Sequence, residues 1–270
     1  MNVLTVYANP NPKSFCHAVL EQVTKGLADA GHRNEVVDLY AIGFDPVLRT
    51  RDAPNWMDEN LPQEILDRQN LKQDILDGAH GPLQRILAKR WIGDKDARGI
   101  IHALQEERRP KDVLEQQAKV ARAQALVLVS PVWFLGMPAI LKGWIERVFT
   151  LGFAFGLTAE GWRGDIDGRI PLLTLEKALV LSTTLFDERA YRAGLRDAMR
   201  TTIDEFTLHY PGIKQIQHEY FYAVYGADDA TRRGYLERAY RLGKELALPS
   251  AGAAREPPPS FADRDAIPAR

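Results

Sequence analysis

The stretch LVLVSPVWFLGMPAILKGWIERVF, residues 126–149, contains the pattern that decides the fold. Its first five residues are almost all apolar, which is typical of a parallel strand buried on both faces at the centre of a sheet. A loop rich in aromatic residues follows, and Pro138 then suits the first turn of a helix. That helix is expected to bury one stripe, formed by Ile140, Leu141, Trp144, Ile145, Val148 and Phe149.

Helical segments alternate with four further strand-like segments. Residues 2–8 stop at NPNPKS, where Ser14 is a good N-cap for a helix that ends near Gly31. The remaining strands are expected at residues 34–39, 177–184 and 213–226. This alternation predicts an α/β fold, a flavodoxin-like doubly wound five-stranded parallel sheet with the strand order 2-1-3-4-5.

Charged, helix-leaning residues interrupt the alternation between the second and third strands, from about 55 to 112. We expect a long helical insertion there, which covers the sheet edge, a partner subunit or the pocket. The predicted organisation is one domain, residues 1–248, that contains this insertion. A Pro- and Ala-rich tail follows at residues 249–270 and is expected to be extended.

The composition is that of an ordinary globular protein, with 45% apolar and 26% charged residues. Because 35 Lys and Arg face 36 Asp and Glu, the net charge of −1 gives no electrostatic case for nucleic acid or an anionic membrane. The single cysteine cannot form an internal disulfide, and the N-terminus has no basic n-region. We therefore expect a cytoplasmic protein, and one without a membrane span.

In such sheets, ligands bind beyond the carboxyl ends of the strands, so the informative loops are residues 9–17, 131–136 and 183–191. The first loop places Ser14 and the free N–H groups of a helix start where a phosphate could bind, with Lys13 nearby. From this loop alone, a simple strand–helix turn is the better interpretation. Cys16 is interpreted as a small buried hydrophobe rather than a nucleophile.

The second loop presents Trp133, Phe134 and Leu135 at the end of the most apolar strand. A flat heteroaromatic ring could stack there, although such clusters more often belong to the core. In the third loop, Thr183 and Thr184 could bind a ring edge or merely finish a strand. Tyr191 could donate a proton, stack on a substrate or simply be exposed. No GxSxG or HExxH is present, and the six histidines have no ligand-like spacing, so hydrolase and metal sites lose support.

These residues resemble a known family. The run PVWFLGMPAILKGWIERVF is similar to the segment that runs along the isoalloxazine ring in flavin-dependent NAD(P)H:quinone oxidoreductases of the DT-diaphorase type. The resemblance continues through GFAFG (residues 152–156) and through SFCHAV and VVDLY near the N-terminus. It covers most of the chain outside residues 55–112 and the tail.

The resemblance implies a flavodoxin-like homodimer that holds FAD, or FMN as in smaller members. Hydride would pass from NADH or NADPH to flavin N5 and then to a quinone in a ping-pong cycle. The catalytic tyrosine would be Tyr191. By position, the residues implied to bind the flavin are Asn9, Ser14, Phe15, Cys16, Pro131, Val132, Trp133, Phe134, Leu135, Thr183, Thr184 and Leu185.

The chain departs from the family pattern in several places. Asn9 stands where the mammalian enzymes carry a histidine, and Phe134 stands in place of their tryptophan. Leu185 and Phe186 replace a Gly-Gly pair, and Asp197 falls where the catalytic histidine would sit. These changes place the proton relay and the quinone pocket in doubt, while the flavin-binding wall keeps its support.

Two alternatives to an enzyme remain open. A non-catalytic redox sensor or regulatory subunit that binds a flavin or a nucleotide would tolerate the loss of Gly-Gly. A substrate-turnover assay would separate it from a reductase. An FMN electron shuttle is a weaker alternative, because flavodoxins are usually strongly acidic and this chain is nearly neutral.

Overall fold

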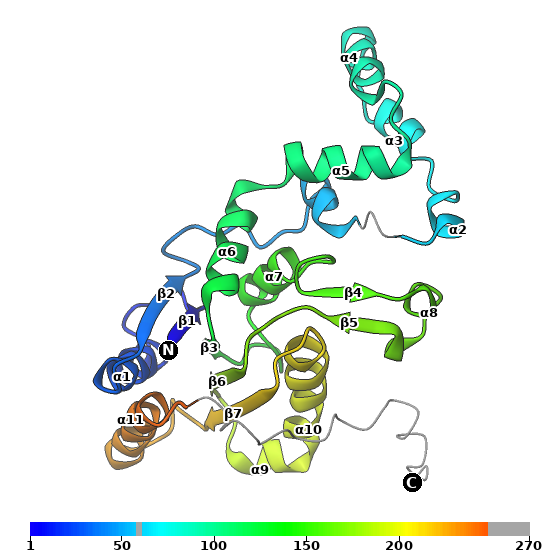
Figure 1. The fold of residues 1–270 in the computed structure, drawn as a ribbon. Coiled ribbons are helices and arrows are strands. Elements are labelled where there is room, and N and C mark those ends of the chain that lie inside the picture. Colours follow the sequence, from blue (N-terminus) through cyan, green and yellow to red (C-terminus); the bar gives the residue numbers. More distant parts are fainter. Residues whose placement is uncertain (58–60, 248–270) are drawn as a thin grey trace.

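The computed structural model describes residues 1–57 and 61–247, so the predicted tail lies outside the described residues. Five parallel strands form the central sheet in the order β2-β1-β3-β6-β7, as Figure 1 shows. They are β1 (Asn2–Tyr7), β2 (Arg33–Asp38), β3 (Ala125–Pro131), β6 (Lys177–Thr183) and β7 (Gln215–Phe221). The prediction of a five-stranded parallel sheet is therefore correct.

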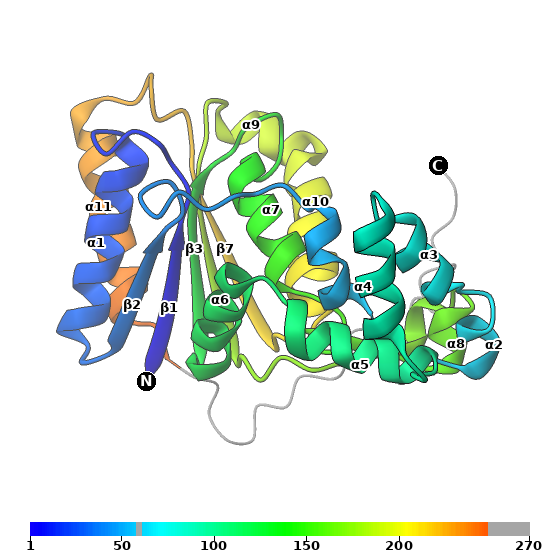
Figure 2. The same ribbon diagram turned by 90° about the horizontal axis from the view of Figure 1, so that it is seen from above.

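Helices cover both faces of the sheet (Figure 2). On one face lie α1 (Phe15–Asp29) and α11 (Asp229–Lys244). The other face is covered by α6 (Lys111–Arg122), α7 (Ala139–Val148) and a distorted helical run after β6. That run consists of α9 (Glu188–Ala190), η3 (Tyr191–Leu195), α10 (Arg196–Met199) and η4 (Arg200–His209).

The segment 126–149 folds as its pattern predicts. All seven residues of β3 are buried, because helices cover the sheet on both sides. In α7, Trp144 and Val148 are fully buried in one apolar cluster with residues of β1 and β3. A second cluster fills the space between the sheet and the helices α1 and α11. The strand ends are thus fixed on both sides by packed side chains.

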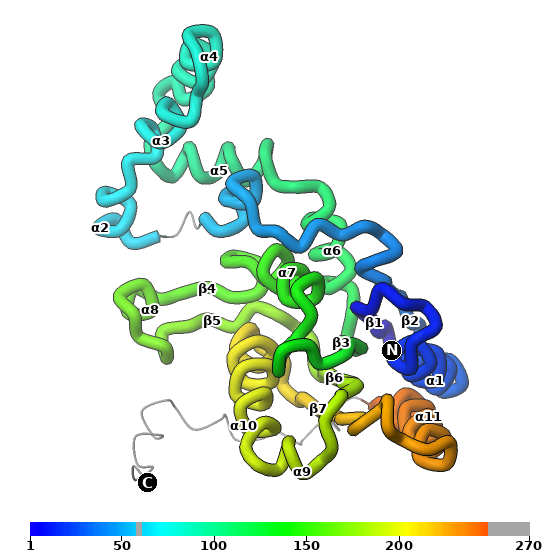
Figure 3. The backbone as a smooth tube through the Cα atoms, turned by 180° about the vertical axis from the view of Figure 1, so that it is seen from behind, coloured from blue at the N-terminus to red at the C-terminus, as the bar shows by residue number. Residues whose placement is uncertain are grey.

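The insertion comprises five short helices between β2 and α6. They are η1 (Thr50–Trp56), α2 (Gln63–Leu66), α3 (Leu71–Asp77), α4 (Pro82–Ile92) and α5 (Ala97–Arg108). A separate apolar cluster, which includes Leu66, Ile100 and Ile101, holds these helices together. Figures 2 and 3 show that they lie to the side of the sheet and not over its carboxyl ends. The expectation that the insertion closes over the pocket is therefore wrong.

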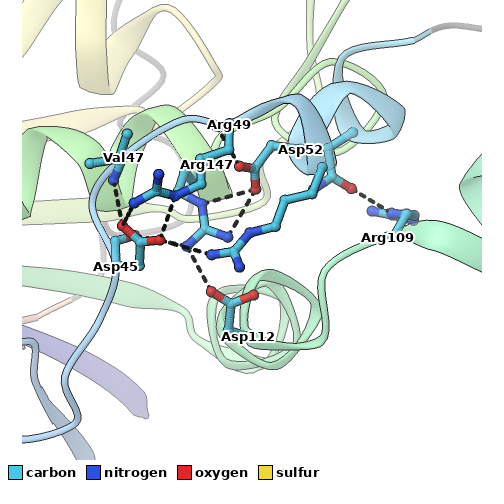
Figure 4. Close-up of polar contacts among 9 residues, drawn as sticks. Asp45, Val47, Arg49, Asp52, Arg109, Asp112 and Arg147 are labelled. Carbon is cyan, nitrogen blue, oxygen red and sulfur yellow. Dashed lines mark hydrogen bonds and ion pairs between the residues drawn. The ribbon is translucent and has the colours of Figure 1, made fainter. Parts of the chain in front are cut away.

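A buried ion pair joins the insertion to α7 (Figure 4). The guanidinium of Arg147 is fully buried and lies 2.9 Å from the carboxylate of Asp52, whose side chain is 1% exposed. The same guanidinium donates to the backbone oxygen of Asp45 at 2.8 Å and to the Asp112 carboxylate at 2.7 Å. These bonds satisfy a buried charge, so they fix the start of the insertion on the helix that follows the aromatic loop.

An antiparallel hairpin between α7 and β6 was not predicted. Its strands are β4 (Phe155–Leu157) and β5 (Arg169–Pro171), and α8 (Ala159–Trp162) and η2 (Ile166–Gly168) lie between them. Each strand is only three residues long and none of its residues is fully buried, so no apolar alternation marks it. Within the described residues, no helix has the length and apolar character needed to cross a bilayer.

Candidate functional site

The three predicted loops meet at the carboxyl edge of the sheet. The register places Tyr7 opposite Val129 and Pro131 opposite Thr183, so β1, β3 and β6 end side by side. The N–H of Val132 donates to the Thr183 oxygen at 2.9 Å, which ties the second loop to the third. Parallel pairing alone therefore brings the candidate residues of all three loops to one place.

Ser14 caps α1 and orients its first turn. Its hydroxyl accepts from the His17 N–H at 3.1 Å and lies 3.5 Å from the Tyr7 hydroxyl. The N–H groups of Phe15 and Cys16 stand at the start of the helix, where no intrahelical acceptor exists. This end of α1 can therefore bind an anion such as a phosphate. The Phe15 ring packs edge-on against the ring of Tyr235.

Cys16 connects the first loop with the third. Its side chain is 2% exposed, and burial raises the pKa of the thiol to about 12. Hydrogen bonds to Thr183 and Asn9 oppose that shift in part. The thiol is therefore neutral at physiological pH and unsuited to nucleophilic attack, as its interpretation as a small hydrophobe anticipated. Three of the predicted residues are in contact here.

The aromatic loop contains a strained turn. Trp133 and Gly136 exchange two backbone hydrogen bonds of 3.1 Å, and both residues between them have positive φ: Phe134 at 45° and Leu135 at 64°. Such a turn normally takes Asn or Gly, because the left-handed region costs other residues about 1–2 kcal/mol each. The Phe134 side chain is fully exposed at 107%. Strained residues cluster at ligand and active sites, so this turn is a candidate contact for a ligand.

The third loop is fixed by backbone contacts. The Phe186 oxygen accepts from the Thr184 hydroxyl at 2.8 Å and from the Ala223 N–H at 3.1 Å. Thr184 is buried, whereas Leu185 and Phe186 are exposed. The two side chains that replace Gly-Gly therefore stand at the rim of the site and do not fill a cleft between the strand ends.

Tyr191 is buried, with 1% of its surface exposed. Its ring packs at a tilt against Tyr220 and Tyr222, with centroids 5.1 Å and 5.2 Å away. Burial raises the pKa of the Tyr191 phenol, and a hydrogen bond to Thr184 opposes the shift. The phenol is neutral and does not face solvent in this structure. A catalytic role for Tyr191 stays a prediction. Asp197, by contrast, is exposed on α10.

A network of hydrogen-bonded side chains behind Tyr191 was not predicted from the sequence. His218 lies 2.9 Å from the Ser182 hydroxyl and 2.8 Å from the Asp204 carboxylate. Ser182 is only 3% exposed and belongs to a central strand, so this order of side chains does not make a hydrolase site. The signal was present in HEYFY, where alternation places His218 and Tyr220 on one face of β7, with Tyr222 just beyond the end of the strand.

His17 is the second residue that the analysis missed. Its Nδ1 atom is buried and has no hydrogen-bond partner among the described residues. The imidazole lies at the start of α1. Its ring packs edge-to-face with the ring of Tyr7, and the two centroids are 5.5 Å apart. An unsatisfied polar atom beside free helix N–H groups fits a bound ligand that has both phosphate and hydroxyl groups. Together with the exposed ring at Phe134, these residues fit a flavin nucleotide.

Comparison with known proteins identifies the fold family. A sequence model of the flavodoxin-like fold matches residues 1–242. The chain belongs to this flavodoxin-like family. It is 28% identical over 220 residues to a ribosyldihydronicotinamide dehydrogenase-like protein of Penicillium crustosum, a match that covers 79% of this chain and 70% of that protein.

Two further flavodoxin-like relatives have quinones in their names. NAD(P)H dehydrogenase (quinone) 1 of Cavia porcellus is 28% identical over 225 residues, which cover 82% of this chain and 68% of the relative. The solved NAD(P)H:quinone oxidoreductase of Methanothermobacter marburgensis superposes with a TM-score of 0.64 at 29% identity. That alignment covers 92% of this chain and 99% of the archaeal chain.

Proposed function

We propose that this flavodoxin-like chain is an NAD(P)H-dependent flavoenzyme. It reduces quinones or related aromatic acceptors by two-electron hydride transfer through flavin N5, in a ping-pong cycle. The observation that carries the proposal is the strained turn Trp133–Gly136, which holds Phe134 in solvent at the same edge of the sheet as the start of α1. The names of the three relatives support the choice of nicotinamide donor and quinone acceptor.

Each part of the site has a task in this proposal. Ser14 orients α1 so that the first N–H groups of the helix bind the phosphates. His17 accepts or donates a hydrogen bond to the ligand beside them. Trp133, Phe134 and Leu135 hold the ring and exclude water from its face. Thr183 and Thr184 lie at the polar edge of the ring. A bound flavin supplies the two-electron chemistry, and the protein supplies orientation and a dry environment.

The finer parts of the proposal concern cofactor, donor and assembly. We propose FAD, with FMN as the alternative, because the chain has the length of the FAD-binding branch that it resembles. NADH or NADPH is the donor. The protein works as a cytoplasmic homodimer. A second subunit would cover the exposed apolar rim formed by Phe134, Leu135, Leu185 and Phe186.

A redox sensor without turnover is the second candidate. Two observations favour it: Tyr191 is 1% exposed, and the apolar side chains of Leu185 and Phe186 are exposed in the third loop. A sensor would bind the same flavin or nucleotide, but a quinone would reoxidise it slowly.

The first experiment is an absorption spectrum of the purified protein, followed by release and chromatography of any cofactor. We expect about one flavin per chain, anaerobic bleaching by NADH or NADPH, and rapid reoxidation by a quinone. Phe134→Ser should weaken flavin binding, whereas Phe206→Ser, a change of an equally apolar ring on η4, should not. A colourless protein that takes up neither FAD nor FMN would refute the proposal. Bleaching without quinone turnover would favour the sensor.

A further inference from the structure

Helix α4 carries an apolar face that no described part of the chain covers. Leu83, Ile86 and Leu87 lie at positions i, i+3 and i+4, so they share one side of the helix. Their exposed fractions are 68%, 62% and 55%, which is unusual for three neighbouring aliphatic residues. Figures 1 and 3 show that α3 and α4 project from the body of the molecule, with α4 farthest out.

The same helix is locally basic. Residues 82–92 contain Arg85, Lys89 and Arg90 and no acidic residue. Arg85 has a distant partner in Asp77 at 3.8 Å, whereas Lys89 and Arg90 form no ion pair with any described residue. The net charge of −1 for the whole chain conceals the excess of positive charge on α4 itself, although Asp77 of α3 and Glu107 of α5 lie beside the helix. Basic, amphipathic helices of this kind are typical of proteins that bind anionic surfaces.

A hollow beside α4 has the same character. Its volume is about 690 Å³, and its walls include the apolar residues Ile75, Leu87 and Trp91 together with Arg90 and Arg108. No carboxylate is found among the described residues that line it. An occupant of this hollow would contact apolar side chains together with the guanidinium groups of Arg90 and Arg108.

We propose that α4 and this hollow form a peripheral docking site for an anionic lipid bilayer. The aliphatic face enters the boundary between headgroups and acyl chains, and the stems of Lys89 and Arg90 extend to the lipid phosphates. A projecting, convex helix reaches a flat surface without hindrance from the core (Figure 1). A second copy docked through the same face would instead bring like charges together. The inference does not depend on the proposed reductase activity.

Co-sedimentation of the full-length protein with lipid vesicles tests this inference. We expect binding to phosphatidylcholine vesicles that contain one quarter phosphatidylglycerol. Binding to pure phosphatidylcholine should be at least tenfold weaker, and 0.5 M salt should suppress binding to the anionic vesicles. Lys89→Glu/Arg90→Glu should lower binding to anionic vesicles at least tenfold, because the two residues that would contact the lipid phosphates then repel them. Leu83→Ser/Ile86→Ser should lower it as well.

Matched controls are available elsewhere on the surface. Ile42→Ser/Val47→Ser removes two aliphatic side chains of similar exposure, and Arg233→Glu/Arg241→Glu reverses two exposed charges on α11; neither should change binding. Circular dichroism confirms that each variant is folded. Equal binding to neutral and anionic vesicles would overturn the inference, as would unchanged binding of both α4 variants. A change of oligomeric state in the α4 variants would show instead that this face is an interface between copies.

Discussion

The flavodoxin-like core and the insertion of residues 50–108 are stabilised in different ways. In the core, two apolar clusters pack on opposite faces of one sheet, and the central strand β3 is buried along its whole length. The insertion has a single, smaller cluster, and it leaves the aliphatic side of α4 in solvent. The core therefore buries both faces of its sheet, whereas the insertion leaves one face of a helix uncovered.

Polar contacts form much of the junction between the two regions. Arg147 of α7 binds Asp52 of η1, and Arg109 bonds at 2.8 Å to both Asn55 and Gln117. The candidate site belongs wholly to the core, and the insertion lies to its side (Figure 2). The strand ends that form the candidate site are therefore positioned by the packing of the core and not by the insertion.

Breaking the junction should have the largest effect on stability. Arg147→Ala leaves the buried carboxylate of Asp52 without its partner, and we expect a loss of about 3–5 kcal/mol in the free energy of unfolding. Urea denaturation measures the loss. Lys142→Ala on the same helix removes an exposed ion pair with Glu146 and should cost less than about 1 kcal/mol. Equal losses for the two variants would show that Arg147 is not a buried anchor.

A mutation that creates a cavity in the insertion should destabilise the insertion without destabilising the core. Ile101 is fully buried in the cluster of the insertion, so Ile101→Ala should cost about 2–5 kcal/mol locally. Hydrogen exchange should then accelerate in α5 while the amides of β3 keep their protection. The matched change in the core, Leu128→Ala, should accelerate exchange in both regions. Loss of protection in β3 on Ile101→Ala would show that the two regions unfold together.

The close approach of the chain to α7 gives a smaller effect. A Cβ atom at Gly143 would lie 2.1 Å from the Pro46 oxygen, so Gly143→Ala must push residues 45–47 away from the helix. We expect a loss of about 1–3 kcal/mol, as for other overpacked sites, visible as a lower midpoint in urea. Gly136→Ala is the control, since no atom lies within 4 Å of the added methyl group. A neutral Gly143→Ala would mean that the segment yields without cost.

The sheet could be predicted because burial on both faces of a strand favours a continuous apolar run. Residues 125–129 of β3 and 178–181 of β6 form such runs, so these strands are recognisable without knowledge of their neighbours. The hairpin β4–β5 could not be predicted, since its short, half-buried strands depend on packing such as that of Phe155 against Trp56 and Tyr210. The same dependence on distant partners hides the helix boundaries of the insertion.

The candidate site shows the same division. Parallel topology alone places Ser14, Trp133 and Thr183 at one edge, so these positions followed from the sequence. The burial of Tyr191 did not, because it arises from the rings of Tyr220 on β7 and Tyr222 just after it, far along the chain. The strained turn was also hidden, since neither of its central residues is one that favours positive φ.

Relief of the strain in the turn Trp133–Gly136 should have the smallest effect on stability. It should stabilise the fold while it weakens flavin binding. Phe134→Gly removes an exposed side chain from the left-handed region, so we expect a gain of about 1 kcal/mol in the free energy of unfolding. Flavin affinity, measured by fluorescence titration, should fall, because the ring that would contact the cofactor is gone. Ala223→Gly relieves the same kind of strain outside the aromatic loop and should stabilise the fold without changing affinity. If Phe134→Gly leaves flavin affinity unchanged, neither the ring of Phe134 nor the strain that holds it in solvent contributes to flavin binding.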